Sequence, residues 1–311
     1  MTNLQVERCG NELALRISSI KVSGGKLMSR TKDVLTVTFD SNVLIRVLQP
    51  ENVQNLCTAD IEDLKMVNEA IRTGMIEGFV AKTFFTKEAV PKVHREDVYR
   101  KAFRRYKEIT SQSTDARLNN HNLKIRPIKK HQFDSERLFS RRNFLPVLRQ
   151  YHVRILHTYL FGDILPQMKG GESVEDVFRP DDFYHWDGDE GEVMERNDMC
   201  FHFIVDDLKA GVLCVNVIDN EDNNSKEDSG EISKFSKNVA EEADVQAIAT
   251  HYAHQIDIFC TEDKGKNAGG NSVMKAENKA ELTKKFGIRF CTLSELMRLI
   301  EKRNVSAMLS K

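Results

Sequence analysis

The feature that most constrains the fold is an alternation of short apolar runs with longer segments of helical periodicity. The runs 33–39, 76–85 and 256–263 have strand composition, and the segments 58–74, 232–255 and 277–287 are predicted helices. The segment 288–303 is predicted to be a short strand and then a helix capped at Thr292 or Ser294. Strands that alternate with helices are typical of a parallel sheet. The sequence therefore predicts an α/β fold, and we see no internal repeat.

Four acids fall where such a sheet would bring them together. Asp40 ends the first strand in "TVTFDSNVLI", Asp263 ends the strand "IDIFCTED", and Glu88 follows the strand 76–85 at the start of an expected helix with Thr86 as its cap. Asp244 lies within the helix 232–255, flanked by small and apolar residues. Ligands of open α/β sheets bind outside the carboxyl ends of the strands, which is where these acids are expected to meet.

Four converging carboxylates do not all stay ionised without a cation. A set of oxygen ligands suits Mg²⁺ or Mn²⁺ better than zinc, and a solvated cluster of this kind fits metal-assisted hydrolysis of a phosphodiester by water. Taken singly, each acid is more simply explained as a surface or capping residue. The hypothesis therefore depends on all four together.

Three other constellations are weaker. A phosphatase of the haloacid-dehalogenase type needs a second Asp two residues after the first, and that position is Asn42. His251 and His254 lie near Cys260 without the spacing of a metal site, so packed or solvated histidines are the simpler interpretation. The segment "GKNAGGNS" (265–272) lacks Walker spacing, but its single lysine, Lys266, and Lys264 before it are candidates to touch phosphate at the rim of a site.

Three segments together resemble the PIN domain family. "TFDSNVLI" is similar to its opening strand and Asp-(Ser/Thr)-Asn motif, and "GFVAKTFFTKEAV" to its second strand and the helix that bears a Glu. "EEADVQAIATHYAHQIDIFCTEDKG" resembles its helical Asp followed by a strand that ends in Thr-x-Asp. The resemblance covers under half of the chain and rests on the order of the motifs, because no single motif is specific. The chain departs from the family in length, since 155 residues separate Glu88 from Asp244 and a compact member would have far fewer.

The resemblance implies a three-layer α/β/α fold and a Mg²⁺- or Mn²⁺-dependent nuclease, most often an endoribonuclease. It implies Asp40, Glu88, Asp244 and Asp263 as catalytic metal ligands, and Ser41, Asn42, Thr261 and Lys264 as second-layer or phosphate-contacting residues. Glu77 precedes Glu88 by eleven residues, but it stands at the start of its strand, the wrong end of the sheet. The expected organisation is an N-terminal extension (1–32), a nuclease core (33–92 and 232–305) and a large, mainly helical insertion (93–231).

The net charge of −1 conceals a division of the insertion into a basic and an acidic part. Residues 91–160 hold 17 Lys and Arg against 6 Asp and Glu, whereas residues 161–262 hold 7 against 25. We expect the basic helical part (93–160) to bind nucleic acid, RNA in preference to DNA, through Arg100, Lys101, Arg104 and Arg105 beside interleaved aromatic residues. The acidic, loop-rich part (161–231) is a candidate intramolecular mimic of nucleic acid that blocks the enzyme.

The remaining expectations follow from composition. The chain has no apolar run of membrane-spanning length and no basic leader followed by an apolar stretch, so we expect a cytoplasmic protein that does not enter membranes. Six scattered cysteines without C-x-x-C spacing predict reduced, mostly buried thiols. An inhibitory protein partner and a homo-oligomer both stay open, as do a DNA-directed defence nuclease and a catalytically degenerate PIN-fold scaffold.

Overall fold

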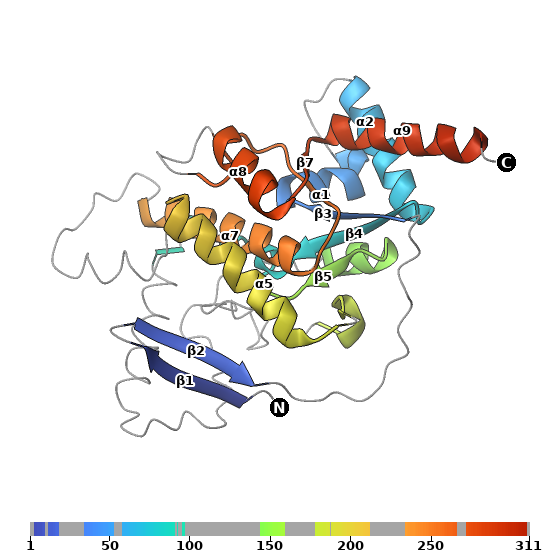
Figure 1. Cartoon of the computed structure of the whole chain (residues 1–311). Coiled ribbons are helices and arrows are strands. Elements are labelled where there is room, and N and C mark those ends of the chain that lie inside the picture. The colour runs from blue at the N-terminus through green and yellow to red at the C-terminus, as the bar shows by residue number, and fades with distance from the viewer. Residues whose placement is uncertain are drawn as a thin grey trace.

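The computed structural model of the 311-residue chain describes residues 3–9, 12–18, 34–52, 58–90, 92, 95–96, 144–158, 178–186, 188–211, 234–265 and 272–309. Its centre is a five-stranded sheet in the order β5-β4-β3-β6-β7, in which every neighbouring pair is parallel (Figure 1). The α/β class with a central parallel sheet is therefore confirmed. The strands are β3 (Leu35–Phe39), β4 (Ile76–Ala81), β5 (Arg154–Leu156), β6 (Ile258–Cys260) and β7 (Phe290–Cys291).

Helices cover both faces of the sheet and give three layers. On one face, α1 (Ser41–Leu48), α2 (Thr58–Arg72) and α9 (Leu293–Leu309) pack with a helical segment at 144–150 over the alternate β3 residues Leu35, Val37 and Phe39. On the other face lie α5 (Glu190–His202), the π-helical turn η5 (Phe203–Asp207), α7 (Lys234–Ala253) and α8 (Ala276–Phe286). Because both faces are covered, all five residues of β3 are buried.

The order of the strands creates a switch point between β3 and β6. From β3 the chain passes through α1, the 3₁₀ turn η1 (Pro50–Asn52) and α2 to β4 on one side, whereas from β6 it passes through α8 to β7 on the other. The connecting helices lie on opposite faces of the sheet. In open α/β sheets, a crevice at the carboxyl ends of the strands forms at such a point.

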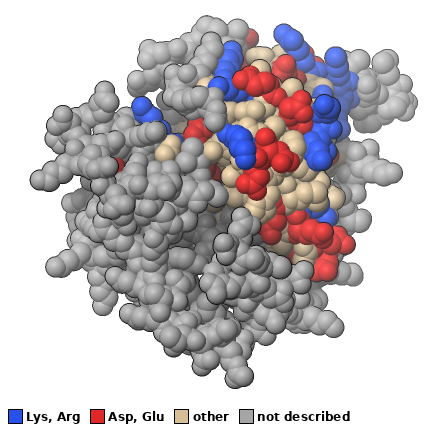
Figure 2. Space-filling view, turned by 60° about the vertical axis from the view of Figure 1, so that its left-hand side comes forward, with Lys and Arg blue, Asp and Glu red and all other residues tan. Residues whose placement is uncertain are grey.

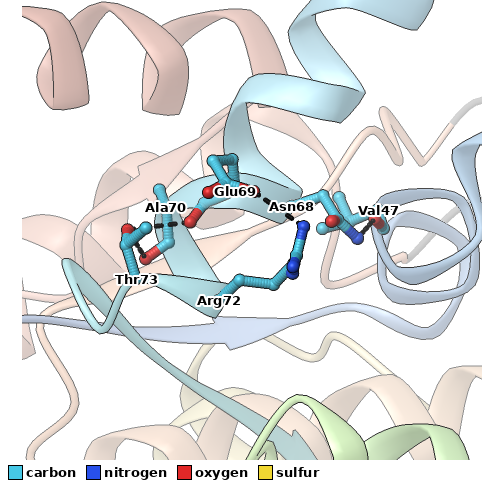
Figure 3. Close-up of polar contacts among 6 residues, drawn as sticks. All are labelled: Val47, Asn68, Glu69, Ala70, Arg72 and Thr73. Carbon is cyan, nitrogen blue, oxygen red and sulfur yellow. Dashed lines mark hydrogen bonds and ion pairs between the residues drawn. The ribbon is translucent and has the colours of Figure 1, made fainter.

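The joint between α1 and α2 is fixed by a buried amide. Asn68 donates from Nδ2 to the carbonyl of Val47 at 2.7 Å (Figure 3). The bond satisfies one of the carbonyls at the end of α1 that have no partner within the helix. One turn later, Arg72 pairs with Glu69, and Thr73 donates its hydroxyl to the Glu69 carbonyl as the helix ends. The segment 58–74 is therefore a helix as predicted, and it begins at Thr58.

The C-terminal elements follow their sequence signals closely. Helix α8 ends at Gly287, which has φ +71° and donates its amide to the Thr283 carbonyl. Helix α9 begins with a reciprocal cap, in which Glu295 accepts from the Thr292 amide and the Glu295 amide donates to the Thr292 hydroxyl. Both predicted helices and the two short strands before them are confirmed.

Two predictions about the middle of the chain were wrong. The basic part 93–160 was expected to be helical, but helical backbone stops at residue 150, His152 takes φ +53°, and Arg154–Leu156 forms β5 beside β4. As an edge strand, β5 pairs with β4 over three residues, and this tertiary pairing outweighs the local helical pattern. The segment 86–92 was expected to start a helix. Residues 85–89 instead form a hydrogen-bonded turn after the 3₁₀ turn η2 (Lys82–Phe84).

Part of the acidic region also has regular structure. The 3₁₀ turn η4 (Pro180–Asp182) is held by a bidentate pair between Arg149 and Asp182, and the helix α5 lies beside α7. Cys200, Phe201 and Ile204 are buried. Residues 161–177, 187 and 212–231 of the acidic part, the candidate mimic of nucleic acid, lie outside the described residues.

The N-terminal segment contains an antiparallel pair, β1 (Asn3–Cys9) and β2 (Glu12–Ser18), with Cys9 opposite Glu12. Among the described helices, none combines the length and the apolar character needed to cross a membrane. Three described cysteines, Cys200, Cys260 and Cys291, are free and buried as predicted.

Candidate functional site

Asp40 stands at the switch point, directly after β3. Its amide donates to the Cys260 carbonyl of β6, and its own carbonyl accepts the amides of Val43 and Leu44, so the backbone of Asp40 starts helix α1. Aspartate at this position usually caps the helix with its side chain, but the Asp40 side chain makes no capping bond. The carboxylate is therefore directed to other partners.

The principal partner of Asp40 comes from the end of β6. Thr261 donates from Oγ1 to Asp40 Oδ2 at 2.7 Å, and the same hydroxyl oxygen accepts the amide of Asp263 at 3.0 Å. Asp263 Oδ1 accepts the amide of Gly265 at 2.7 Å, and the Asp263 carbonyl accepts from Lys279 Nζ at 3.0 Å. Thr261 thus links the first and last of the four predicted acids.

A glycine is required where the chain leaves Asp263. Gly265 has φ +65°, and a Cβ at this position would lie 2.8 Å from the Lys275 backbone nitrogen. Both the left-handed backbone and the contact with the start of α8 exclude larger residues. The tight turn holds Asp263 between β6 and α8.

Glu88 reaches the same edge from the turn after β4. Its amide donates to the Thr83 carbonyl at 3.0 Å, and its carbonyl accepts from Arg95 at 3.4 Å. Its carboxylate is one of the charges that raise the pKa of Asp40 and of Asp244. The predicted residue therefore arrives at the predicted place, although a turn rather than a helix carries it.

Asp244 lies on α7 and faces the other three acids. Burial raises the pKa of Asp244 well above its ordinary value, and the charges of Asp40, Glu88, Glu241 and Asp263 raise it further. Burial also raises the pKa of Asp40 to about 6, with Glu88 and Asp263 adding to the rise and hydrogen bonds from Thr261 and Ser41 opposing it. These mutual effects show that the structure brings the four predicted acids together.

A fifth acid, Glu241, was missed in the sequence. It lies three residues before Asp244 on α7, a spacing that places both side chains on one face of the helix. Burial, followed by the charge of Asp263, raises the pKa of Glu241, whereas hydrogen bonds with Ser272 and Val273 lower it. The spacing of three was a usable signal, because helical neighbours of a functional residue share its environment.

A small pocket opens among these elements. Asp40, Glu88 and Asp244 line it together with Ser41 and the side of Thr38, and its apolar wall includes Met274. Asp263 stands outside this lining, on the β6 side. A charged, partly desolvated pocket at the carboxyl edge of a parallel sheet is a typical place for a ligand.

The other predicted residues are placed less centrally. The Ser41 hydroxyl lies 3.5 Å from Asp40 Oδ1. Lys264 is exposed. Burial lowers the pKa of Lys279, and the charge of Lys264 lowers it further. Asn42 is exposed on the first turn of α1, and no contact in the described part of the chain joins it to the acids. The predicted nucleic-acid contacts Arg100, Lys101, Arg104 and Arg105 lie outside the described residues.

The histidines near β6 are packed in the core. His251 shares a 2.9 Å hydrogen bond with the Thr38 hydroxyl and stands edge-on to Phe259, and His254 shares one with the Thr250 carbonyl. Both are buried, and burial lowers the pKa of His251 to about 3. These contacts account for both rings without a metal.

The described surface does not present one sign of charge. On the face shown in Figure 2, basic and acidic side chains stand next to each other over the described part. Helix α8 shows the same mixture, with Lys284 and Lys285 following Glu277 and Glu281. The strongly basic run of the sequence falls mostly in residues that the structure leaves undescribed.

The carboxylates are close enough to act on one another, but they do not form a finished metal site. Within the described residues, no three His, Cys, Asp or Glu side chains are arranged to hold a metal ion. What the site offers is an oxygen-only donor set in which burial and like charge raise the pKa of two members. That combination suits a hard divalent cation, whose charge would remove the mutual repulsion.

Comparison with known proteins found no match: no protein-family model, no curated protein and no solved structure is similar to this chain.

Proposed function

We propose that this protein is a divalent-metal-dependent nuclease of PIN-like type that hydrolyses phosphodiester bonds, with RNA as the favoured substrate. The observation that carries the proposal is the convergence of Asp40, Glu88, Asp244 and Asp263 on the carboxyl edge of a parallel sheet. The charges of Glu88 and Asp263 add to the rise in the pKa of Asp40 and of Asp244, a costly arrangement that a bound cation relieves.

The residues divide by position. Asp40, Glu88 and Asp244 line the pocket and are the candidates to hold Mg²⁺ or Mn²⁺, with Asp263 beside them on the β6 turn. Such a cation, when bound, supplies a nucleophilic water at neutral pH and charge stabilisation at phosphate. Thr261 orients Asp40 through its 2.7 Å hydrogen bond, and exposed Lys264 stands at the rim where a phosphate would approach. No residue of the site acts as a covalent nucleophile in this proposal.

The test is a cleavage assay with the full chain. End-labelled single-stranded RNA, tRNA and single-stranded DNA are incubated with Mn²⁺, with Mg²⁺ or with EDTA. We expect Mn²⁺-dependent cleavage of RNA with internal products, and a loss of at least about a hundredfold in Asp40→Asn and Asp263→Asn. Glu69→Gln is the matched control, because it neutralises an exposed acid on α2 away from the site.

A second candidate function is a scaffold that binds nucleic acid without cutting it. The observation that favours it is the absence, among the described residues, of three side chains already arranged around a metal position. Binding of RNA without cleavage under every metal condition would support the scaffold and contradict the nuclease. Cleavage of DNA alone would favour the DNA-directed alternative.

A further inference from the structure

A lysine and a glutamate form an ion pair in the interior, directly beside the acid cluster. Lys87 is fully buried, and its Nζ contacts Oε1 of Glu242, whose side chain is 9% exposed. Gln246 Nε2 donates to the same carboxylate oxygen at 3.3 Å. The site described above does not use this pair, although the chain devotes two desolvated charges to it.

Buried ion pairs are poor sources of stability. Removing two charges from water costs about as much as their attraction returns, and apolar pairs of similar volume often serve as well or better. The position of the pair is more informative than its energy. Lys87 directly precedes Glu88, and Glu242 lies two residues before Asp244 on α7.

The pair joins two elements that their own functional charges push apart. Glu88 and Asp244 line the same pocket, so the turn after β4 and helix α7 present carboxylates of like charge to each other. Only contacts of opposite sign or firm packing hold such elements in place. The ion pair supplies an attractive contact at the same junction.

A second set of bonds anchors the far side of the same turn. Ser236 on α7 donates its hydroxyl to the Lys92 carbonyl at 2.7 Å, and Arg95 donates to the Val90 and Glu88 carbonyls and to that of Ser236. These bonds fix the segment after Glu88 to the start of α7. The Lys87–Glu242 ion pair holds the segment directly before Glu88 to α7, next to the carboxylates that repel each other.

We propose that Lys87 and Glu242 are positioning residues that hold Glu88 against Asp244, so that the acid site is assembled before any cation binds. The inference rests on the proposed function only for its consequence, which is tighter metal binding. The geometric part concerns the metal-free protein and is tested without a metal.

The metal-free test is a double-mutant cycle on urea unfolding, run at pH 8.5 with EDTA in the full chain. In the wild-type background we expect Glu88→Gln and Asp244→Asn each to raise the urea concentration at the unfolding midpoint. The double variant should raise it by less than the sum of the two single effects, because each change relieves the same repulsion. In the Lys87→Met/Glu242→Met background the two changes should become additive. Methionines form no directed bond that opposes the separation of the two carboxylates.

The isosteric variant Glu242→Gln provides a second background if the double methionine variant does not fold. It keeps the shape of the side chain but leaves the Lys87 charge without its partner, so the coupling between positions 88 and 244 should again fall. Wild-type coupling that persists in either folded background would overturn the proposal. An absence of coupling in the wild-type background would overturn it too.

The second arm measures Mn²⁺ affinity by calorimetric titration. We expect Glu242→Gln and the double methionine variant to bind Mn²⁺ about tenfold to a hundredfold more weakly, the range usual for partners that orient metal ligands. Asp182→Asn is the control: it breaks the ion pair with Arg149 elsewhere in the fold, and should lower the urea midpoint while leaving Mn²⁺ affinity unchanged. Equal affinity losses in the control and in the pair variants would reduce the pair to a general structural role.

The two arms separate the two proposals. If the coupling is present in the wild-type protein and falls when the pair is lost, but the wild-type protein binds no Mn²⁺, the positioning role stands and the metal-dependent function fails. If Mn²⁺ binds but the coupling is unaffected by loss of the pair, the function stands and the positioning role fails.

Discussion

Thr261 Oγ1 donates a 2.7 Å hydrogen bond to Asp40 Oδ2 across 221 positions of sequence. Asp40 follows β3 and Thr261 follows β6, the neighbouring strands that flank the switch point of the sheet. The bond stabilises the ionised form of Asp40 against burial and against the charge of Glu88, both of which favour the protonated form. Thr261 is therefore the residue that keeps the central carboxylate available.

Replacing Thr261 with Val should raise the pKa of Asp40 above its present value of about 6. A hydrogen bond to a charged group contributes about 1.5–3 kcal/mol, which corresponds to roughly one to two pKa units. The pH at which cleavage and Mn²⁺ binding reach half of their plateau should move up accordingly. Thr261→Ser keeps the hydroxyl and should behave as wild type. An unchanged pH profile in a folded Thr261→Val protein would show that the bond does not govern Asp40.

Asp40→Asn should stabilise the metal-free protein at high pH only. The pKa of Asp40 is raised from 3.8 to about 6, so the folded state binds more protons than the unfolded state between these values. Stability associated with this group is therefore complete below pH 3.8 and declines as pH rises through 6, for a loss of about 3 kcal/mol. Urea unfolding in EDTA should show the gain for Asp40→Asn at pH 8 and little difference near pH 4.

Mn²⁺ should stabilise the protein and displace protons when it binds. A ligand at a hundred times its dissociation constant adds about 2.7 kcal/mol to the free energy of unfolding, so the thermal midpoint should rise with Mn²⁺ and not with an equal concentration of K⁺. Because the pKa of Asp40 is near 6 and that of Asp244 is raised well above its usual value, binding near pH 6 should release protons. Calorimetry in buffers of different ionisation enthalpy measures that release, which should shrink in Asp40→Asn.

Gly265→Ala and Gly287→Ala form a matched pair. Both glycines have positive φ, +65° and +71°, so both substitutions incur the left-handed backbone penalty of about 1 kcal/mol. Only at Gly265 would the new Cβ also meet backbone, at 2.8 Å from the Lys275 nitrogen, whereas nothing lies within 4 Å at Gly287. Gly265→Ala should therefore be the more destabilising change. It should also weaken Mn²⁺ binding, because the turn that holds Asp263 must shift. Equal effects on Mn²⁺ binding would contradict this role of the turn.

Local sequence signals located most of the site correctly. Asp40 and Asp263 were predictable because both follow apolar runs, and parallel strands gather their carboxyl ends at one edge. Asp244 was predictable because small and apolar neighbours mark a buried stretch of helix. The helix end at Gly287 and the cap at Thr292 follow from single residues with strong local preferences.

Long-range contacts account for what the sequence did not predict. Arg154–Leu156 carries no strand pattern strong enough to outweigh its helical surroundings, and it is a strand because β4 offers it an open edge. Glu88 lies on a turn whose amide bonds to the Thr83 carbonyl, and Ser236 of α7 donates its hydroxyl to the Lys92 carbonyl beyond that turn. The pairing of Lys87 with Glu242 joins residues 155 positions apart, and no local pattern indicates it.

The sequence by itself therefore determined the class of fold and which acids end its strands, because periodicity and strand ends are properties of neighbouring residues. Tertiary structure alone decided how those acids interact. Their pKa values, the hydrogen bond from Thr261 and the buried pair beside Glu88 all depend on distances between segments that are remote in the chain. Electrostatic energy varies with those distances and with burial, and neither quantity is defined until the chain has folded.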